Sequence, residues 1–225
     1  MGMVNPSINA FTGESVTELL DRRAQVVYTT AAVSQGESVS NSWTTTTFPG
    51  GSNGQLPSVH FVTSATINNR GTTSGGSTGP AGKLRVNVWQ VKLAHTTNCR
   101  LFCVLSNSAF TDGDTPTGDY AGFRYSTNVP DTNWQCITNN NSGIGVTDSG
   151  VPVSTNEVLL SVTYNTIAAT PSCRFYINRN LVAVRTASLP RTSLSAYCWR
   201  VFLTTLEGAT KEVDVSFLTE RYHTI

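Results

Sequence analysis

Hydrophobic and polar residues alternate with a period of two along most of the chain after residue 25, and this alternation predicts β-strands. Turn residues separate the alternating segments at regular intervals, as they do in sandwiches and barrels. No helical segment connects one strand to the next, so a parallel α/β fold is not expected. The expected strands are residues 25–33, 38–48, 59–68, 83–93, 100–105, 120–126, 133–138, 158–164, 173–186 (a hairpin), 196–205 and 212–222.

The hairpin at residues 173–186 has the clearest pattern in the chain. Cys173, Phe175 and Ile177 fall on one face of its first strand. Residues 178–180 (Asn-Arg-Asn) tolerate positive φ and predict the turn. No side chain in the hairpin is chemically reactive, so this segment predicts a structural surface.

The N-terminal residues have a different character. Residues 1–13 lack periodicity and are expected to form an extended arm, and Ser15 followed by Glu18 forms a capping box that predicts a short helix. A helix this short is not stable alone, so we expect residues 1–24 to dock on another subunit and residues 25–225 to form the sandwich. The expected partner-binding residues are Pro6, Ile8, Phe11, Val16, Leu19 and Leu20.

Two glycine-rich segments interrupt the strand pattern. Residues 48–57 and 69–82 are rich in Gly, Ser, Asn and Thr and are expected to be loops. Both are long for a compact domain, which makes them candidates for contact with a partner.

The composition excludes several classes of partner. Charged residues make up only 13% of the chain, against about 25% in an average soluble domain. The net charge is +1 and the basic residues are scattered, so nucleic acid is not an expected partner. No apolar segment is long enough for a transmembrane helix, and the start lacks a secretory signal pattern. We therefore expect that the protein is made in a cytoplasm and does not associate with a membrane.

The chain contains five cysteines at wide spacing: Cys99, Cys103, Cys136, Cys173 and Cys198. Each lies in a strand-like context, so we expect buried free thiols. One or more disulfides are an alternative, as is a zinc site, although the spacing matches no usual zinc pattern.

Two groups of carboxylates are candidates for chemistry. Glu212 and Asp214 share a face of the last expected strand, but Ser216 stands where a glycosidase would carry a third acid. Asp112 and Asp114, with Asp119 close by, resemble a calcium loop but lack its remaining ligands. We therefore expect no catalytic residue, no metal and no cofactor.

The histidines and tryptophans are also weighed as site residues. None of the three histidines, His60, His95 and His223, lies in a recognisable nucleophile motif. The tryptophans could stack on sugar rings, but each lies within a strand pattern, so core or subunit-contact positions are expected. They are Trp43, Trp89, Trp134 and Trp199.

From Gly122 onward, several short sequence segments follow one another in an order typical of one family. They are Gly-Phe-Arg-Tyr-Ser (122–126), Trp-Gln-Cys-Ile-Thr (134–138), Thr-Asp-Ser-Gly-Val-Pro-Val (147–153) and the 175–183 hairpin. This order resembles the concanavalin-like (laminin G-like) jelly-roll domains of bacteriophage virion proteins. The resemblance implies an antiparallel jelly-roll β-sandwich. In that family the hairpin turn carries Asp-Gly, and residues 178–180 are expected to lengthen it by about one residue.

The resemblance implies a phage virion structural protein without enzymatic activity. We expect a capsid decoration (cement) protein that forms a homotrimer and binds the major capsid protein through its N-terminal arm. Its location would be the virion. The alternative is a tail-fibre or receptor-binding adhesin that binds a host surface glycan through loops such as residues 50–57 and 71–82.

Overall fold

The computed structural model describes residues 46–48, 58–79, 84–107, 110–166, 168–191 and 197–223. The expected arm and helix, residues 1–24, lie outside the described residues, as do the expected strand 25–33 and most of the loop 48–57. The expected partner-binding residues Pro6, Ile8, Phe11, Val16, Leu19 and Leu20 also lie outside them.

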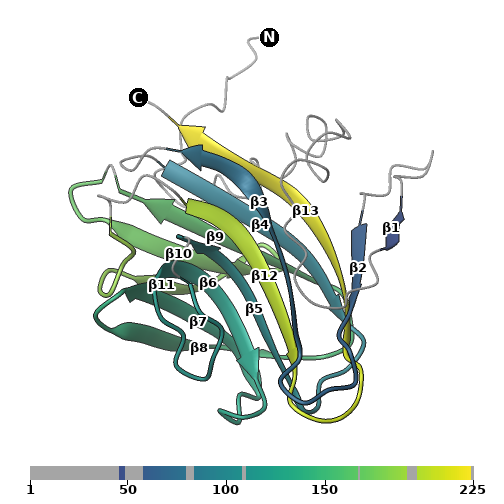
Figure 1. Cartoon of the computed structure of the whole chain (residues 1–225). Coiled ribbons are helices and arrows are strands. Elements are labelled where there is room, and N and C mark those ends of the chain that lie inside the picture. The colour runs from purple at the N-terminus through teal and green to yellow at the C-terminus, as the bar shows by residue number, and fades with distance from the viewer. Residues whose placement is uncertain are drawn as a thin grey trace.

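The described residues form two antiparallel sheets that face each other as two layers (Figure 1). The seven-stranded sheet has, in spatial order, β1 (Thr46–Phe48), β2 (Ser58–Val62), β13 (Glu212–His223), β4 (Leu84–Leu93), β9 (Val158–Asn165), β10 (Ser172–Ile177) and β11 (Asn180–Arg185). The six-stranded sheet has β3 (Arg70–Gly79), β12 (Tyr197–Thr205), β5 (Cys99–Ser106), β6 (Asp119–Ser126), β7 (Asn133–Asn140) and β8 (Ile144–Pro152). The expected antiparallel β-sandwich is confirmed.

The hydrophobic core lies between the two sheets. Alternation places every second residue of the central strands in it, for example Trp89, Val91 and Leu93 on β4. Trp134 and Trp199 are also buried there, as the sequence predicted, while Trp43 lies outside the described residues. Burial of this apolar area supplies most of the folding free energy, at roughly 25 cal/mol per Å².

A second apolar cluster lies on the outer face of the six-stranded sheet. Phe102 on β5, Tyr120 on β6 and Phe202 on β12 are buried there, and Phe110 packs on all three, with ring centroids 4.7–5.4 Å apart. Phe110 belongs to the β5–β6 connection, whose described residues 107 and 110–118 are called the 107–118 segment below, and its ring covers part of this face. The apolar run predicted for β5 is therefore buried on both of its faces, as expected.

The glycine-rich segment 69–82 was expected to be a loop, and this prediction is wrong for residues 70–79. They form β3, an edge strand that pairs with β12 from Arg70↔Thr204 to Gly79↔Tyr197. Each interior glycine costs about 0.5–1 kcal/mol of backbone entropy, which is why local propensity argues against a strand. The hydrogen bonds to a partner more than a hundred residues away offset this cost.

The neighbouring strands also differ from expectation. The strand expected over residues 59–68 ends at Val62, because the chain turns toward β3 through Asn68, whose φ is 62°. The strand β8 was not expected. Its hydrophobic alternation is weak because the more buried positions carry the small or polar residues Gly145, Thr147 and Ser149.

The hairpin of β10 and β11 has the expected faces but a shorter turn than expected. Ile177 pairs with Asn180, so only Asn178 and Arg179 form the turn, with φ of 49° and 71°. These positive φ values fit a two-residue hairpin loop. The irregularity of this hairpin lies instead in the strands, where the register shifts between Phe175 and Tyr176.

The described cysteines Cys99, Cys103, Cys136 and Cys173 are buried free thiols, as expected. Burial raises the pKa of all four thiols, to about 11 for Cys99 and about 12 for Cys136. The protonated thiols therefore act as small apolar side chains in the core.

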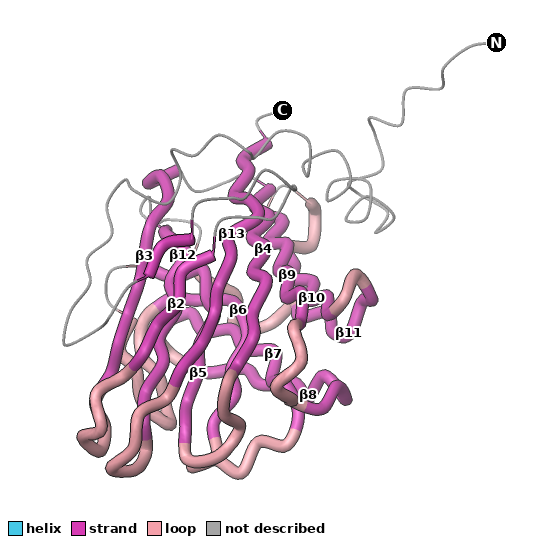
Figure 2. Tube along the Cα trace, turned by 90° about the vertical axis from the view of Figure 1, so that its right-hand side faces the viewer, coloured by secondary structure: helices cyan, strands magenta, loops and turns pink. Residues whose placement is uncertain are grey.

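Several connections lie together at one end of the sandwich (Figure 2). The β2–β3 turn bonds the end of β12 there, since the Asn68 N–H donates to the Thr205 carbonyl at 2.8 Å. The β4–β5 loop bonds the β12–β13 loop, since the Leu206 N–H donates to the Asn98 carbonyl at 2.8 Å. Within the described part of the chain, no helix is long and apolar enough to cross a membrane.

Candidate functional site

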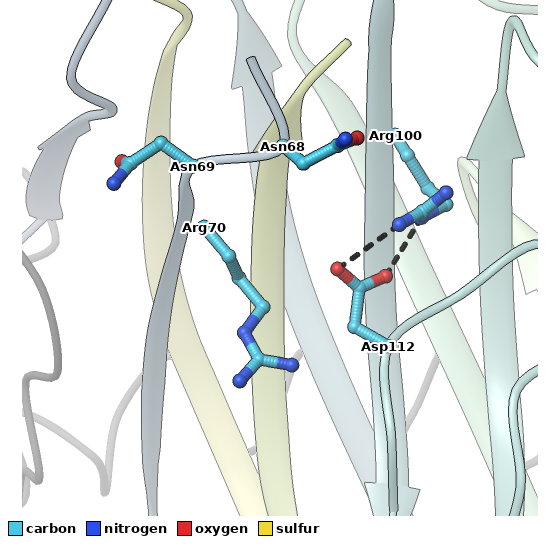
Figure 3. A pocket seen from close by; sticks show the side chains of 5 residues that line it. All are labelled: Asn68, Asn69, Arg70, Arg100 and Asp112. Atoms are coloured by element: carbon cyan, nitrogen blue, oxygen red, sulfur yellow. Dashed lines mark hydrogen bonds and ion pairs between the residues drawn. The ribbon is translucent and has the colours of Figure 1, made fainter. Parts of the chain in front are cut away.

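A pocket of about 310 Å³ opens where the β2–β3 turn meets the outer face of the six-stranded sheet. Its lining residues come from three separate parts of the chain: the β2–β3 turn, the start of β5 and the 107–118 segment (Figure 3). All five are polar or charged: Asn68, Asn69, Arg70, Arg100 and Asp112.

Arg100 forms the buried side of this pocket. The β-strand period directs it to the outer face of β5, the same face that carries Phe102. Its Nε donates to Asp112 Oδ1 at 2.7 Å and its Nη2 donates to Asp112 Oδ2 at 3.3 Å, which gives a bidentate pair. The side chains of Arg100 and Asp112 are 9% and 4% exposed, so this pair is nearly removed from water.

The pair extends into a small network. Arg100 Nη1 donates to Asp114 Oδ1 at 2.8 Å, and the Thr204 hydroxyl donates to Asp112 Oδ2. Burial lowers the pKa of Arg100, but the hydrogen bonds and charges of Asp112 and Asp114 raise it by more, so its pKa lies above the ordinary value. Arg100 therefore stays charged and fixes the 107–118 segment on the sheet.

Arg70 and Asn68 form the more open side of the pocket. The Arg70 guanidinium lies 5.9 Å from the centroid of the Phe202 ring, within cation–π range. Figure 3 shows the Asn68 side chain directed toward Arg100, with the Arg70 guanidinium apart from the Arg100–Asp112 pair. The Asn68 side chain is exposed.

The acidic loop that resembles a calcium site does not gather its carboxylates. Asp112 and Asp114 both pair with Arg100, whereas Asp119 pairs with Arg191, whose Nη2 donates to Asp119 Oδ2 at 2.7 Å. Over the described ranges, no group of three or more His, Cys, Asp or Glu side chains is arranged to hold a metal ion. Arginine side chains, rather than a metal ion, pair with the carboxylates of this loop.

Glu212 and Asp214 lie on one face of β13, as the alternation predicted, and Val213 and Val215 lie in the core. His60 on β2 stands opposite Asp214, and its Nδ1–H donates to Asp214 Oδ1 at 2.7 Å. His60 Nε2 lies 3.7 Å from Glu212 Oε2. The imidazole thus contacts both carboxylates, and Ser216 adds no third acid to this polar row.

The pocket residues were missed in the sequence, apart from Asp112. Asn68, Asn69 and Arg70 lie at the border of a strand and a glycine-rich segment, and Arg100 begins an apolar run. None of these positions carries a local motif. The nearest signal was the charge balance, because a buried-strand arginine needs a carboxylate partner and the loop at residues 111–119 supplies several.

No protein-family model matches this sequence, and no curated protein matches it. Solved structures do match the fold. The potassium-bound carbohydrate recognition domain of Emp46p superimposes with a TM-score of 0.51 at 10% identity, over 80% of this chain and 87% of that chain. An endo-β-1,4-glucuronan lyase from the fungus Trichoderma reesei gives a TM-score of 0.59 at 9% identity, over 85% of this chain and 91% of that one.

A third similar structure is Rv0315, described as an immunostimulatory antigen and pseudo β-1,3-glucanase of Mycobacterium tuberculosis. It gives a TM-score of 0.53 at 11% identity, over 74% of this chain and 75% of that one. At these identities the likeness shows the fold alone. The chain has a jelly-roll-like β-sandwich, consistent with the concanavalin-like fold that the sequence resemblance implied.

Proposed function

We propose that this chain is a glycan-binding β-sandwich module that acts as an adhesin. The observation that carries the proposal is the pocket between the β2–β3 turn and the 107–118 segment. Binding sites combine a concave surface with a few polar groups held in fixed positions. Here the Arg100–Asp112 pair supplies the fixed side, and Asn68 and Arg70 supply groups that can hydrogen-bond to sugar hydroxyls.

The fold neighbours support a carbohydrate ligand. One is a carbohydrate recognition domain, one is a glucuronan lyase and one is described as a pseudo β-1,3-glucanase, so the names of three proteins with this sandwich all refer to carbohydrates. Fold likeness supports a function only by analogy, and the pocket is needed to make the proposal specific to this chain.

The setting of the module is also a proposal. We infer from the sequence resemblance that it belongs to a phage virion, as part of a tail fibre or receptor-binding protein. The capsid decoration role, the trimer, the contact with the major capsid protein and the lack of enzymatic activity stay predictions. The decoration role depends on residues 1–24, which lie outside the described residues.

A glycan array probed with the full chain tests the proposal. We expect a restricted set of glycans to bind, and we expect Asn68→Gly to weaken that binding by about two- to tenfold, the effect of losing one neutral hydrogen-bond partner. Glycine keeps the positive φ of residue 68 without strain, so this variant removes only the side-chain amide.

Asn141→Gly is the matched control. Asn141 is also exposed and has a φ of 65°, but it follows β7 at the opposite end of the same sheet, where its Oδ1 accepts from the Gly118 N–H at 3.2 Å, so thermal melting of this variant checks that it is folded. We expect this variant to bind as the natural chain does. An array without any hit would refute glycan binding, and equal binding by Asn68→Gly would show that the glycan does not use this pocket.

A further inference from the structure

The pocket has hydrogen-bond donors to spare but few free acceptors. Asp112 accepts from Arg100 with both oxygens and from the Thr204 hydroxyl as well. Asp114, beside it, accepts from Arg100 with one oxygen and from Asn128 with the other, each at 2.8 Å. Each oxygen of both carboxylates thus already accepts at least one hydrogen bond from the protein.

The amide oxygen of Asn69 is occupied too. It accepts from the Ser64 backbone N–H at 3.0 Å, a bond that holds the β2–β3 turn. A neutral sugar hydroxyl is usually bound by a donor on one side and an acceptor on the other. Because these acceptors already bind protein donors, they have less capacity left for a sugar hydroxyl than the Arg70 donors have for an acceptor.

Arg70 is the group that remains available. Among the described residues its guanidinium has neither a carboxylate partner nor a hydrogen bond, and its one aromatic contact is with Phe202. This ring belongs to the buried cluster with Phe102 and Phe110, so it gives Arg70 a rigid support. The side chain is half-buried, which reduces the screening of its charge by water.

The pairing of the charges, rather than their sum, singles out Arg70. The guanidinium groups of Arg70 and Arg100 are balanced in number by the carboxylates of Asp112 and Asp114. Both carboxylates pair with Arg100, so Arg70 is the lining cation without a carboxylate partner among the described residues. A guanidinium binds a planar oxyanion with two parallel N–H donors, which gives strength and orientation together.

We propose that the pocket takes an acidic glycan and that Arg70 binds the oxyanion of one sugar residue, with the Asn68 amide beside it. The oxyanion is a sugar carboxylate or a sulfate ester, since both offer the same pair of acceptor oxygens to the guanidinium. This inference rests on the proposed glycan binding and adds the class of glycan.

Calorimetric titration of the full chain tests this inference with three oligosaccharides of equal length. One carries a uronic acid, the second is its carboxyl-reduced form and the third is the reduced form with a sulfate ester. We expect at least one acidic probe to bind ten times more tightly than the reduced probe, and we expect this preference to weaken as salt rises. Whichever acidic probe binds identifies the source of the oxyanion.

Arg70→Gln should abolish the preference for the acidic probe over the reduced probe. Arg70→Lys should restore part of it, because lysine keeps the charge but not the fork of donors. Arg179→Gln is the control, since it makes the same change in net charge at an exposed position in the β10–β11 turn. Thermal melting of each variant shows that it is folded.

The outcomes separate the two proposals. If the three probes bind equally, or if Arg70→Gln keeps the preference for an acidic probe, the role of Arg70 is refuted while glycan binding stands. If no glycan on the array and none of the three probes binds, the proposed function itself is refuted.

Discussion

Replacing Asp131 by alanine tests how strongly the buried ion pair on β6 holds the fold. Asp131 accepts from Arg124 Nε and Nη2 at 3.0 Å each, and it accepts from the Ser126 backbone N–H at 3.0 Å. The side chains of Arg124 and Asp131 are 5% and 6% exposed. Alanine would therefore leave a guanidinium and a backbone N–H buried without an acceptor.

The expected loss is about 3–5 kcal/mol, the cost of leaving one member of a buried ion pair uncompensated. That is a large share of the roughly 5–15 kcal/mol by which a domain is stable. Urea denaturation of Asp131→Ala, followed by tryptophan fluorescence, measures it. Because the cost arises from the stranded charge of Arg124, adding Arg124→Met should recover much of the loss.

Asp114→Ala is the matched control. Asp114 also pairs with an arginine, but its side chain is 44% exposed and Arg100 keeps Asp112 as a partner. We expect a loss below about 1 kcal/mol, as for other exposed pairs. The reasoning is refuted if Asp131→Ala costs no more than Asp114→Ala, or if the Arg124→Met and Asp131→Ala losses simply add.

Three further predictions follow from the described residues. Gly122→Ala places a Cβ 2.1 Å from the Cys103 carbonyl oxygen and 2.6 Å from Val104 Cα, so we expect urea denaturation to show a loss of about 3 kcal/mol or more. Gly143 has open space around it, so Gly143→Ala should leave the stability unchanged. Equal stability of the two variants would contradict this reasoning. Peptide mapping after alkylation at about pH 8 should find Cys103 and Cys173 unmodified until denaturant is added, because burial raises the pKa of both thiols. Rapid labelling of these two cysteines in the folded chain would contradict this prediction. The Gly150 N–H and the Asn133 amide lower the pKa of Asp148, so the stabilising effect of its carboxylate is present above the unfolded pKa and is lost as pH falls through the folded pKa. The difference in Tm between the natural chain and Asp148→Asn should therefore shrink below about pH 4. A difference in Tm that is constant with pH would contradict this prediction.

The carboxylate row on β13 shows where sequence reasoning reached its limit. Alternation alone placed Glu212 and Asp214 on one face, and the structure confirms it. It did not reveal that His60 contacts both of them, because His60 lies more than 150 residues away and reaches them through the pairing of β2 with β13. A local pattern determines which way a side chain points, whereas the sheet order determines what it meets.

The sequence by itself determined the strands whose alternation matches one buried face, such as β4 and β10, and the positive-φ turn at Asn178. These features depend on neighbours within a few residues. Only the tertiary structure decided that the glycine-rich segment is β3, because hydrogen bonds to β12 outweigh its poor propensity. Only the tertiary structure assembled the pocket, since Asn68, Arg100 and Asp112 come from separate strands and loops and the ion pair of Arg100 with Asp112 forms across them.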